Sequence, residues 1–512
     1  MKILKISSLL LTVVLVMASC SKKQSQGTGW NYNDSKWGGF EVRDVPEQPA
    51  APGLVFIEGG SFTMGRVADD SRYQWNNVAH TVTVSSFYMD ETEVSNIMYS
   101  EYVYWMQRAY GDEYPELVAK VYPDTNAWRD KLAWREGFVD FYFQSPIYYE
   151  YPVVGVSWNQ ASDYCVWRTD RVNEKILVDA GILMLDLTEI DGAEAFRTDV
   201  YLAGLYRGET KGGMDDLDPA AGGEPRQVRK ADGILVPNYR LPTEAEWEFA
   251  ALGLIGNTYG ERTVEHKIYP WAGTSVRSAN RKYYGQFLTN FKRSRGDAMG
   301  VAGNLNDGWD YTSPVKWYFP NDYGLYNMAG NVSEWCMDVY RKDANPLGGE
   351  DMNPFRGNYY QTYTVQDDEI LTDEITGQIV MRPVDDDMNR RNYRKADNVN
   401  YLDGDYASSL PEFGGKWINE GGDEEDDFGI GEDSENILSE DSVTNKMYRR
   451  VSADQKSVSS LIDNKVRVVK GGSWKDRAYW LQAGTRRYYD QDKSAAWIGF
   501  RCAMDCLGSR TK

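Results

Sequence analysis

The chain has 512 residues, 42% of them hydrophobic, which is enough apolar material for a sizeable core. Its formal net charge is −21, with 56 Lys and Arg against 77 Asp and Glu, and this balance argues against a nucleic-acid partner because neutralising phosphates requires clustered cations. No apolar run after the N-terminus is long enough to cross a bilayer, so we expect the bulk of the chain to be soluble.

The N-terminus has the features of an export signal. Residues 1–19 begin with Lys2 and Lys5, continue with an apolar run over residues 6–16, and end in small residues before Cys20. This order resembles a bacterial lipobox, which would make Cys20 the acylated first residue of the mature chain. Secretory cleavage beside a chance cysteine is the alternative. No acidic residue directly follows Cys20, which favours an outer-membrane anchor facing the periplasm over surface export.

Residues 20–52 are rich in Gly, Ser, Asn, Asp, Gln and Pro, a composition typical of a tether between an anchor and a folded domain. The tether contains more aromatic residues than a plain spacer needs, namely Trp30, Tyr32, Trp37 and Phe40. We expect these side chains to dock on the domain or on a partner.

Short strands and helices are both predicted after the tether. Alternating apolar residues predict short strands at 54–57 and within 82–89. Ser95 is placed to cap a helix with an apolar stripe. Capping boxes predict two further helix starts, one at Ser157 with Gln160 and one at Thr243 with Glu246.

Residues 323–335, YGLYNMAGNVSEW, have the composition of an oxygen cage for a cation. Asn327 and Glu334 offer side-chain oxygens, and the backbone carbonyls of Gly330 and Val332 can turn inward. Six to eight such oxygens suit calcium better than zinc or copper. The alternative is a tight turn that leads into a buried tryptophan.

A series of motifs surrounds this segment in a fixed order, namely LVFIEGGSFTMG, SFYMDETEVSN, PVVGVSWNQASDYCVW, YRLPTEAEWEFAA, GLYNMAGNVSEW and VKGGSW followed by IGFRCA. The series resembles the formylglycine-generating enzyme family, also called the sulfatase-modifying-factor domain. The resemblance covers residues 53–507 and leaves 508–512 as a tail. It implies a compact α+β fold related to C-type lectins, with little regular secondary structure, long loop insertions and structural calcium.

Two insertions interrupt the resemblance, at residues 168–238 and 341–465, and the second contains the acidic stretch 423–440. We expect part of each to bind partners, with disorder as the alternative. A second calcium site is predicted from the side chains of Asn280 and Asp307, to which the resemblance adds the carbonyls of Arg281 and Trp309. A simple turn at Asp307 is the competing interpretation.

Cysteine usage separates a structural role from a catalytic one. The resemblance pairs Cys165 with Cys502 in a disulfide, which an exported chain can keep. Enzymes of the family hold copper(I) between two cysteines just after the GGS motif, whereas Asp476 and Leu481 occupy those positions in this sequence. Leu has no donor atom and one carboxylate is too hard for copper(I). We therefore expect a pseudoenzyme without catalytic residues.

The stretch TGWNYNDSKWGGFE at residues 28–41, ahead of such a domain, resembles the GldJ and GldK type of gliding-motility lipoproteins. This resemblance implies a structural component of the gliding-motility and type IX secretion machinery, with GldK-like and GldN-like components as partners. The alternative is an enzyme or a peptide- or glycan-binding protein that uses the family's cleft, for which the 17 Trp and 36 Tyr residues are suited.

Overall fold

The computed structural model describes residues 23–43, 48, 51–65, 79–111, 113–130, 133–184, 192–223, 225–258, 260, 267–293, 307–340, 361–366, 369–383 and 465–508. The predicted signal peptide, Cys20 and the acidic stretch 423–440 lie outside these residues. The chain divides into two compact units: one made of Met1–Pro49, Val172–Glu189 and Phe196–Val236, and a larger one made of Ala50–Arg171, Ile190–Ala195 and Pro237–Lys512.

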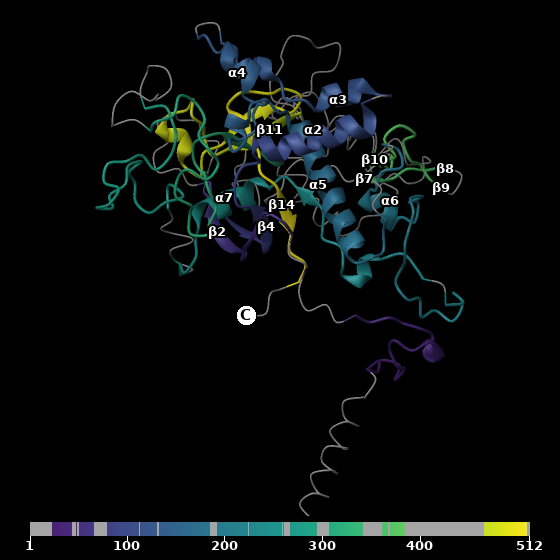
Figure 1. The fold of residues 1–512 in the computed structure, drawn as a ribbon. Helices are drawn as coiled ribbons and strands as arrows, with labels where there is room; N and C mark the ends of the chain where they lie inside the picture. The colour runs from purple at the N-terminus through teal and green to yellow at the C-terminus, as the bar shows by residue number, and fades with distance from the viewer. Residues whose placement is uncertain are drawn as a thin grey trace, which may run out of the picture. The chain divides into compact units, whose positions relative to one another are not determined.

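The larger unit contains two four-stranded sheets. The first has the order β1-β4-β14-β5 and is antiparallel, with strands Leu54–Ile57, Phe87–Asp90, Ala503–Asp505 and Tyr239–Arg240. The second has the order β12-β11-β6-β13, with strands Arg487–Asp490, Val466–Lys470, Ser333–Val339 and Ile498–Gly499, and β13 runs parallel to β6. Strand β14, near the C-terminus, therefore lies between two strands that come much earlier in the sequence (Figure 1).

A two-stranded ribbon and a helix form the centre of the hydrophobic core. The ribbon joins β2 (Gly60–Met64) to β3 (His80–Val84), and helix α7 (Glu244–Leu252) contacts both strands. The rings of Phe62 and Phe249 meet edge to face at 5.3 Å, and Trp247 is completely buried. The expected strands within 82–89 are confirmed as parts of β3 and β4, which pair with different partners.

The helices of the larger unit begin where their capping residues predict. The capping boxes at Ser157 and Thr243 are confirmed, since in both the side chain accepts from the third residue's N–H and the reverse bond is present. Ser95 precedes α2 without a side-chain capping bond. The other helices are α2 (Asn96–Tyr110), α3 (Pro115–Val121), α4 (Glu136–Phe141) and α5 (Trp158–Asp179), whose last turns enter the smaller unit.

The first insertion folds around a small hydrophobic core of its own within the smaller unit. Helix α6 (Thr198–Leu202) belongs to it. Six buried residues make this core: Leu177, Ile182, Leu183, Phe196, Tyr201 and Val228. Of the two interpretations of this insertion, disorder does not apply to its described residues.

The second insertion contributes two short antiparallel ribbons to the larger unit. Strand β7 (Gln361–Tyr363) pairs with β10 (Met381–Pro383), and β8 (Val365–Gln366) pairs with β9 (Glu369–Ile370). Of residues 341–465, only 361–366, 369–383 and Lys465 are among the described residues. Within the described part of the chain, no helix combines the length and the apolar character needed to cross a bilayer.

Candidate functional site: a buried carboxylate cluster and a substituted copper position

The segment at residues 323–335, here called the asparagine loop, wraps tightly as its glycines predict. Asn327 and Asn331 both adopt left-handed backbone angles, with φ of 52° and 57°, which asparagine tolerates better than most residues. Gly330 has φ of 78°, and a Cβ there would lie 2.2 Å from Thr289 Oγ1 and 2.4 Å from the carbonyl oxygen of Asn290. Only glycine fits this position without displacing a neighbour.

Glu93, between β4 and α2, holds the two asparagines of the loop. Its Oε2 accepts from Asn327 Nδ2 at 2.9 Å and its Oε1 accepts from Asn331 Nδ2 at 3.0 Å. The residue is completely buried. Glu93 lies in the motif SFYMDETEVSN but was not predicted as a site residue, although an acidic residue just before an apolar helix start was visible in the sequence.

Glu334 forms a fully buried ion pair with Arg501 next to Glu93. Arg501 donates from Nε and Nη2 to the two carboxylate oxygens, both at 2.6 Å, and the indole of Trp247 donates to Glu334 Oε2 at 2.7 Å. Neither charged side chain of the pair is exposed. Burial and the charge of Glu334 raise the pKa of Glu93 to about 8, and Arg501 opposes this shift.

The four residues predicted as calcium ligands in this loop are all buried, and both carboxylate oxygens of Glu334 already accept from Arg501. The Oδ1 atom of Asn327 is buried without a hydrogen-bond partner. When both Glu93 and Glu334 are ionised, the single positive charge of Arg501 balances only one of them. A bound cation would balance the other. In the described part of the chain, no group of three or more His, Cys, Asp or Glu residues is placed to hold a metal, so these donors depend on amide and carbonyl oxygens.

The second predicted calcium set occupies two surface turns. Asn280 and Arg281 are exposed, and Asn280 Oδ1 accepts from the N–H of Lys282 at 3.0 Å. Asp307 Oδ1 accepts from the N–H of Trp309 at 3.1 Å, which is the turn expected as the alternative. Its Oδ2 is buried without a partner, and burial raises the pKa of Asp307 to about 6. Both interpretations of Asp307 therefore retain a structural basis.

Residues 471–487, here called the GGS loop, contain the two positions where family enzymes have copper-binding cysteines. Asp476 accepts a hydrogen bond from Ser473 Oγ at 2.6 Å and pairs with Arg487 Nη1. The guanidinium of Arg487 lies between the rings of Trp480 and Trp497, at 4.8 and 4.5 Å from their centroids. At Asp476, the first position where the family resemblance implies a cysteine, there is therefore an ion pair whose guanidinium contacts two tryptophan rings.

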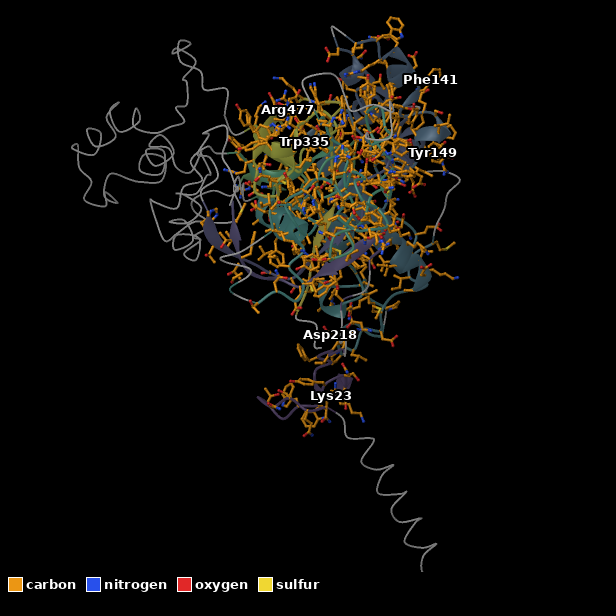
Figure 2. All side chains as sticks on the ribbon, turned by 90° about the vertical axis from the view of Figure 1, so that its left-hand side faces the viewer. Lys23, Phe141, Tyr149, Asp218, Trp335 and Arg477 are labelled. Atoms are coloured by element: carbon orange, nitrogen blue, oxygen red, sulfur yellow. The ribbon has the colours of Figure 1, made fainter. Side chains whose placement is uncertain are left out.

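The second position is apolar and closed. Leu481 has no exposed surface and packs in a cluster with Tyr269, Phe287, Phe291 and Ala329. Figure 2 labels Arg477, an exposed residue of the GGS loop, and Trp335, which lies on β6 and is completely buried. A leucine side chain supplies no ligand for a metal, so the two positions cannot form a soft donor pair.

An aromatic cluster packs against the GGS loop. The rings of Trp128 and Trp474 stack at 6.0 Å, and Tyr311 meets Trp474 edge to face at 5.0 Å. Arg135 lies 4.5 Å from the centroid of Tyr311 and 5.3 Å from that of Trp474, and its buried Nε has no hydrogen-bond partner. Trp128 and Trp474 are buried, whereas Tyr311 and Arg135 are partly exposed, so the ring of Tyr311 and the cation of Arg135 are the groups of this cluster that suit contact with a peptide or a sugar.

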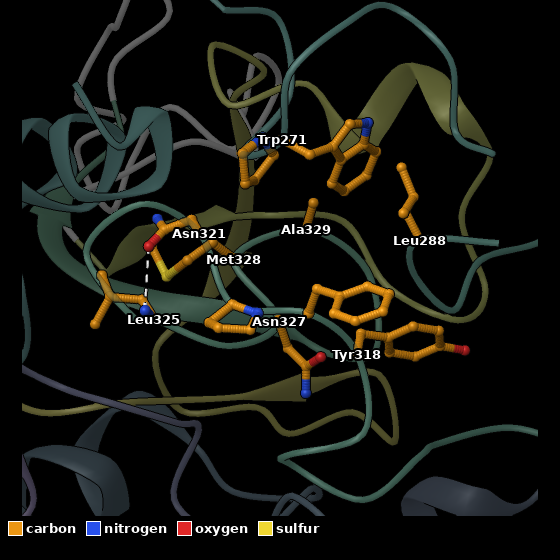
Figure 3. Close-up of a pocket in the computed structure, with 11 residues that line it drawn as sticks. Trp271, Leu288, Tyr318, Asn321, Leu325, Asn327, Met328 and Ala329 are labelled. Carbon is orange, nitrogen blue, oxygen red and sulfur yellow. Dashed lines mark hydrogen bonds between the residues drawn. The ribbon is translucent and has the colours of Figure 1, made fainter. Parts of the chain in front are cut away.

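A shallow apolar pocket lies beside the asparagine loop (Figure 3). Asn321 Oδ1 accepts from the N–H of Leu325 at its edge. No Asp, Glu, His, Lys, Arg or Cys is among the residues that line it: Pro270, Trp271, Leu288, Tyr318, Phe319, Pro320, Asn321, Leu325, Asn327, Met328 and Ala329. Tyr318 is the only residue of this lining with an ionisable side chain, and burial raises the pKa of its hydroxyl.

Cys165 and Cys502 lie next to each other, as the family pairing implies. Their sulfur atoms are 3.5 Å apart, both residues are buried, and both are free thiols in the structure. Asp90 holds Cys502 and Arg168 in place. Its carboxylate accepts from the N–H of Cys502 at 2.9 Å and from both Nη atoms of Arg168. The disulfide between the two cysteines stays a prediction.

Comparison with known proteins gives a family match that covers most of the described chain. The model of the sulfatase-modifying factor enzyme 1-like domain matches residues 41–378. A protein named inactive C-alpha-formylglycine-generating enzyme 2, from Mus musculus, is 24% identical over 324 residues, which cover 60% of this chain and 73% of that protein. The formylglycine-generating enzyme of Thermomonospora curvata is 26% identical over 320 residues, covering 59% and 77%.

Among solved structures, PvdO from Pseudomonas aeruginosa aligns with 89% of this chain and 100% of its own, at a TM-score of 0.39 and 15% identity. The sequence relatives thus include both an enzyme and a protein described as inactive. Whether this chain is catalytic therefore depends on its own residues, Asp476 and Leu481 among them.

Proposed function

The chain belongs to the sulfatase-modifying factor enzyme 1-like domain family, and from this premise we propose that it is a non-catalytic outer-membrane lipoprotein. In this proposal Cys20 carries the lipid anchor, the domain faces the periplasm, and the protein is a structural component of the gliding-motility and type IX secretion machinery. Its partners are GldK-like and GldN-like components of that machinery.

The observation that carries the non-catalytic part is the substituted copper position. Asp476 is already used by Ser473 and Arg487, and Leu481 is completely buried among apolar side chains. A copper(I) centre needs two soft thiolates there, and neither side chain supplies one. Restoring that chemistry would require both replacements and the displacement of Arg487.

The role in an assembly is supported by features outside the former catalytic centre. The first insertion is folded around its own core, so its described residues form a defined surface that a partner can recognise. The aromatic residues of the segment 30–40 belong to the motif that resembles the gliding-motility lipoproteins.

We also propose that calcium is structural in this protein and that the domain retains the C-type-lectin-related framework of its family. The carbonyls of Gly330 and Val332, the free Oδ1 of Asn327 and the carboxylate of Glu334 would hold the ion near the asparagine loop. Asn280, Arg281, Asp307 and Trp309 would hold a second ion. Calcium would supply positive charge beside buried carboxylates and fix the loop, with no part in turnover.

Chemical crosslinking and affinity isolation from native outer membranes test the assembly role. We expect GldK-like and GldN-like components to be recovered with the protein, and mass spectrometry of the mature N-terminus to show acylated Cys20. Recovery of the protein alone would contradict the role. Copper-dependent oxidation of a cysteine-containing peptide by the purified protein would contradict the non-catalytic assignment.

A second candidate function is peptide or glycan binding, and the cluster around Arg135 is the observation that favours it. Arg135 stacks on Tyr311 and Trp474 beside the GGS loop, with a buried Nε that has no protein partner. Binding assays with peptide and glycan arrays, comparing the wild type with Arg135→Ala, distinguish this function: a ligand lost in the variant supports it, and no ligand for either protein contradicts it.

A further inference from the structure

The predicted tether contains a folded element. Residues 23–43 close on themselves through backbone hydrogen bonds, since Ser25 N–H donates to the carbonyl of Trp30 at 2.8 Å and Asn33 N–H donates to that of Phe40 at 2.9 Å. The 3-10 helix η1 (Ser35–Trp37) is capped by Asp34. We call residues 23–43 the N-terminal turn module.

Ion pairs attach this module to the first insertion inside the smaller unit. Arg226 donates to both Glu41 and Asp232, and Arg43 pairs with Asp232 at 3.0 Å. The hydrogen bond from Arg226 lowers the pKa of the Glu41 carboxyl. A Cβ on Gly39 would lie only 1.9 Å from the carbonyl oxygen of Leu217, so the two segments are in direct contact. Figure 2 labels Lys23 of the module and Asp218 of the insertion.

The module carries large aromatic side chains on its surface. Trp30, Trp37 and Phe40 are 53%, 44% and 65% exposed. The rings of Trp30 and Trp37 are paired at 6.1 Å, and Phe40 is paired with Tyr32 at 5.6 Å. The pairing leaves much of each ring exposed. Exposed apolar surface is costly in water unless another surface covers it.

The sequence places this aromatic surface close to the proposed lipid anchor. Ser25 is five residues after Cys20, so the two are at most about 18 Å apart in a fully extended chain. The amide of Ser25 bonds directly to Trp30, which brings the tryptophan pair within similar reach of the anchor. Each headgroup layer of a bilayer is roughly 5–8 Å thick, and Trp and Tyr are enriched there.

Lysines place positive charge in or next to the N-terminal turn module. Lys22, Lys23 and Lys36 lie in or next to the module, although the whole chain has a net charge of −21. Basic residues near a membrane are attracted to anionic headgroups, by about 1 kcal/mol each.

We propose that the N-terminal turn module lies in the headgroup layer of the membrane that holds Cys20, with Trp30 and Trp37 inserted among the lipids. This inference rests on the lipid anchor of the proposed function. The ion pairs of Arg226 then transmit the position of the module to the first insertion, so that this insertion is held at a fixed orientation to the membrane.

The test uses full-length acylated protein in vesicles of phosphatidylethanolamine and phosphatidylglycerol with brominated acyl chains, which quench nearby tryptophan fluorescence. Two of the 17 tryptophans are in the module. We expect the wild type to lose about a tenth of its emission to the brominated lipids, and the double variant Trp30→Phe with Trp37→Phe to lose almost none.

The matched control replaces two exposed tryptophans of the larger unit, Trp134→Phe with Trp317→Phe, which are 89% and 59% exposed in the wild type. This control should keep the quenching of the wild type. Equal quenching in the module variant and the wild type, with Cys20 acylated, would overturn the inference and leave the anchor intact. Crosslinks from residues 30 and 37 to a protein, without quenching, would overturn it in favour of a protein partner.

The mass of the mature N-terminal peptide is measured on the same sample. An unacylated Cys20 would overturn the anchor of the proposed function and this inference together. Phenylalanine keeps the ring at each module position, and the melting curve of each variant shows whether its fold is retained.

Discussion

The asparagine loop and the GGS loop belong to the same domain but differ in what their polar groups do. Glu334 of the asparagine loop and its neighbours Glu93 and Arg501 are completely buried, and an oxygen of Asn327 has no partner. In the GGS loop Asp476 and Arg487 pair with each other, and their side chains keep 10% and 20% of their surface exposed. The oxygen donors of the asparagine loop therefore suit a bound cation. In the GGS loop Arg487 already balances the charge of Asp476, so a bound cation is not needed there.

Replacing each arginine by methionine gives the largest expected difference between the loops. Arg501→Met leaves two buried carboxylates without their cation, so we expect a loss of about 3–5 kcal/mol in the free energy of unfolding. Arg487→Met removes half of a partly exposed pair and should cost about 1 kcal/mol or less. Urea unfolding monitored by fluorescence measures both, and equal losses would show that the loops do not differ as described.

Removing calcium should affect the asparagine loop and leave the GGS loop unchanged. With free calcium at 100 times the dissociation constant of one site, loss of the ion from that site should lower the free energy of unfolding by about 2.7 kcal/mol. Asn327→Ala should abolish the part of this response that comes from the asparagine loop, and Asp476→Ala should retain the whole response as the matched control. Calorimetry with and without chelator measures the shift, and a chelator without effect on the wild type would rule out structural calcium.

The pH dependence of stability reports on Glu93. Its pKa rises from 4.5 to about 8 in the folded protein, so the folded state keeps a proton that the unfolded state releases near pH 4.5. Without calcium, this group therefore makes the wild type less stable as pH rises from about 4.5 to 8.

Glu93→Gln should remove that slope, because glutamine keeps the hydrogen-bonding shape without a charge. Unfolding by urea at several pH values compares the two proteins. An identical pH dependence in both would contradict the assignment of a raised pKa to Glu93.

The smallest expected effect concerns Asp476 itself. Asp476→Ala leaves Arg487 stacked on Trp480 and Trp497 and partly in contact with water, so we expect a loss of about 1 kcal/mol. Asp476→Asn, which still accepts from Ser473, should lose less. A loss of several kcal/mol from Asp476→Ala in urea unfolding would show that the GGS loop has a buried charge after all.

The sequence predicted the local parts of this fold well. The capping boxes at Ser157 and Thr243 depend on residues three apart, so their signal lies within one turn of chain. The family resemblance places the copper-binding cysteines at Asp476 and Leu481, and that assignment stays a prediction. These predictions required only the identity of neighbouring residues.

The partners of Glu93 and Glu334 could not be predicted in the same way. Arg501 is 167 residues from Glu334, and Glu93 is 234 residues from Asn327. The sequence motifs showed each charge but not its distance from the others, since that depends on how the two sheets pack. The folded state of residues 23–43 was also missed, because their Gly- and Asn-rich composition is typical of a spacer and of a tight turn alike.

Strand β14 makes the first sheet depend on residues that are synthesised long after its other strands. It supplies an inner strand, between β4 and β5, from residues 503–505. Until these residues have been synthesised, β4 and β5 each keep an edge without its partner strand, and such edges favour aggregation. A chain cut short before residue 503 would lack this inner strand, so we expect it to be degraded more readily than a chain that contains it.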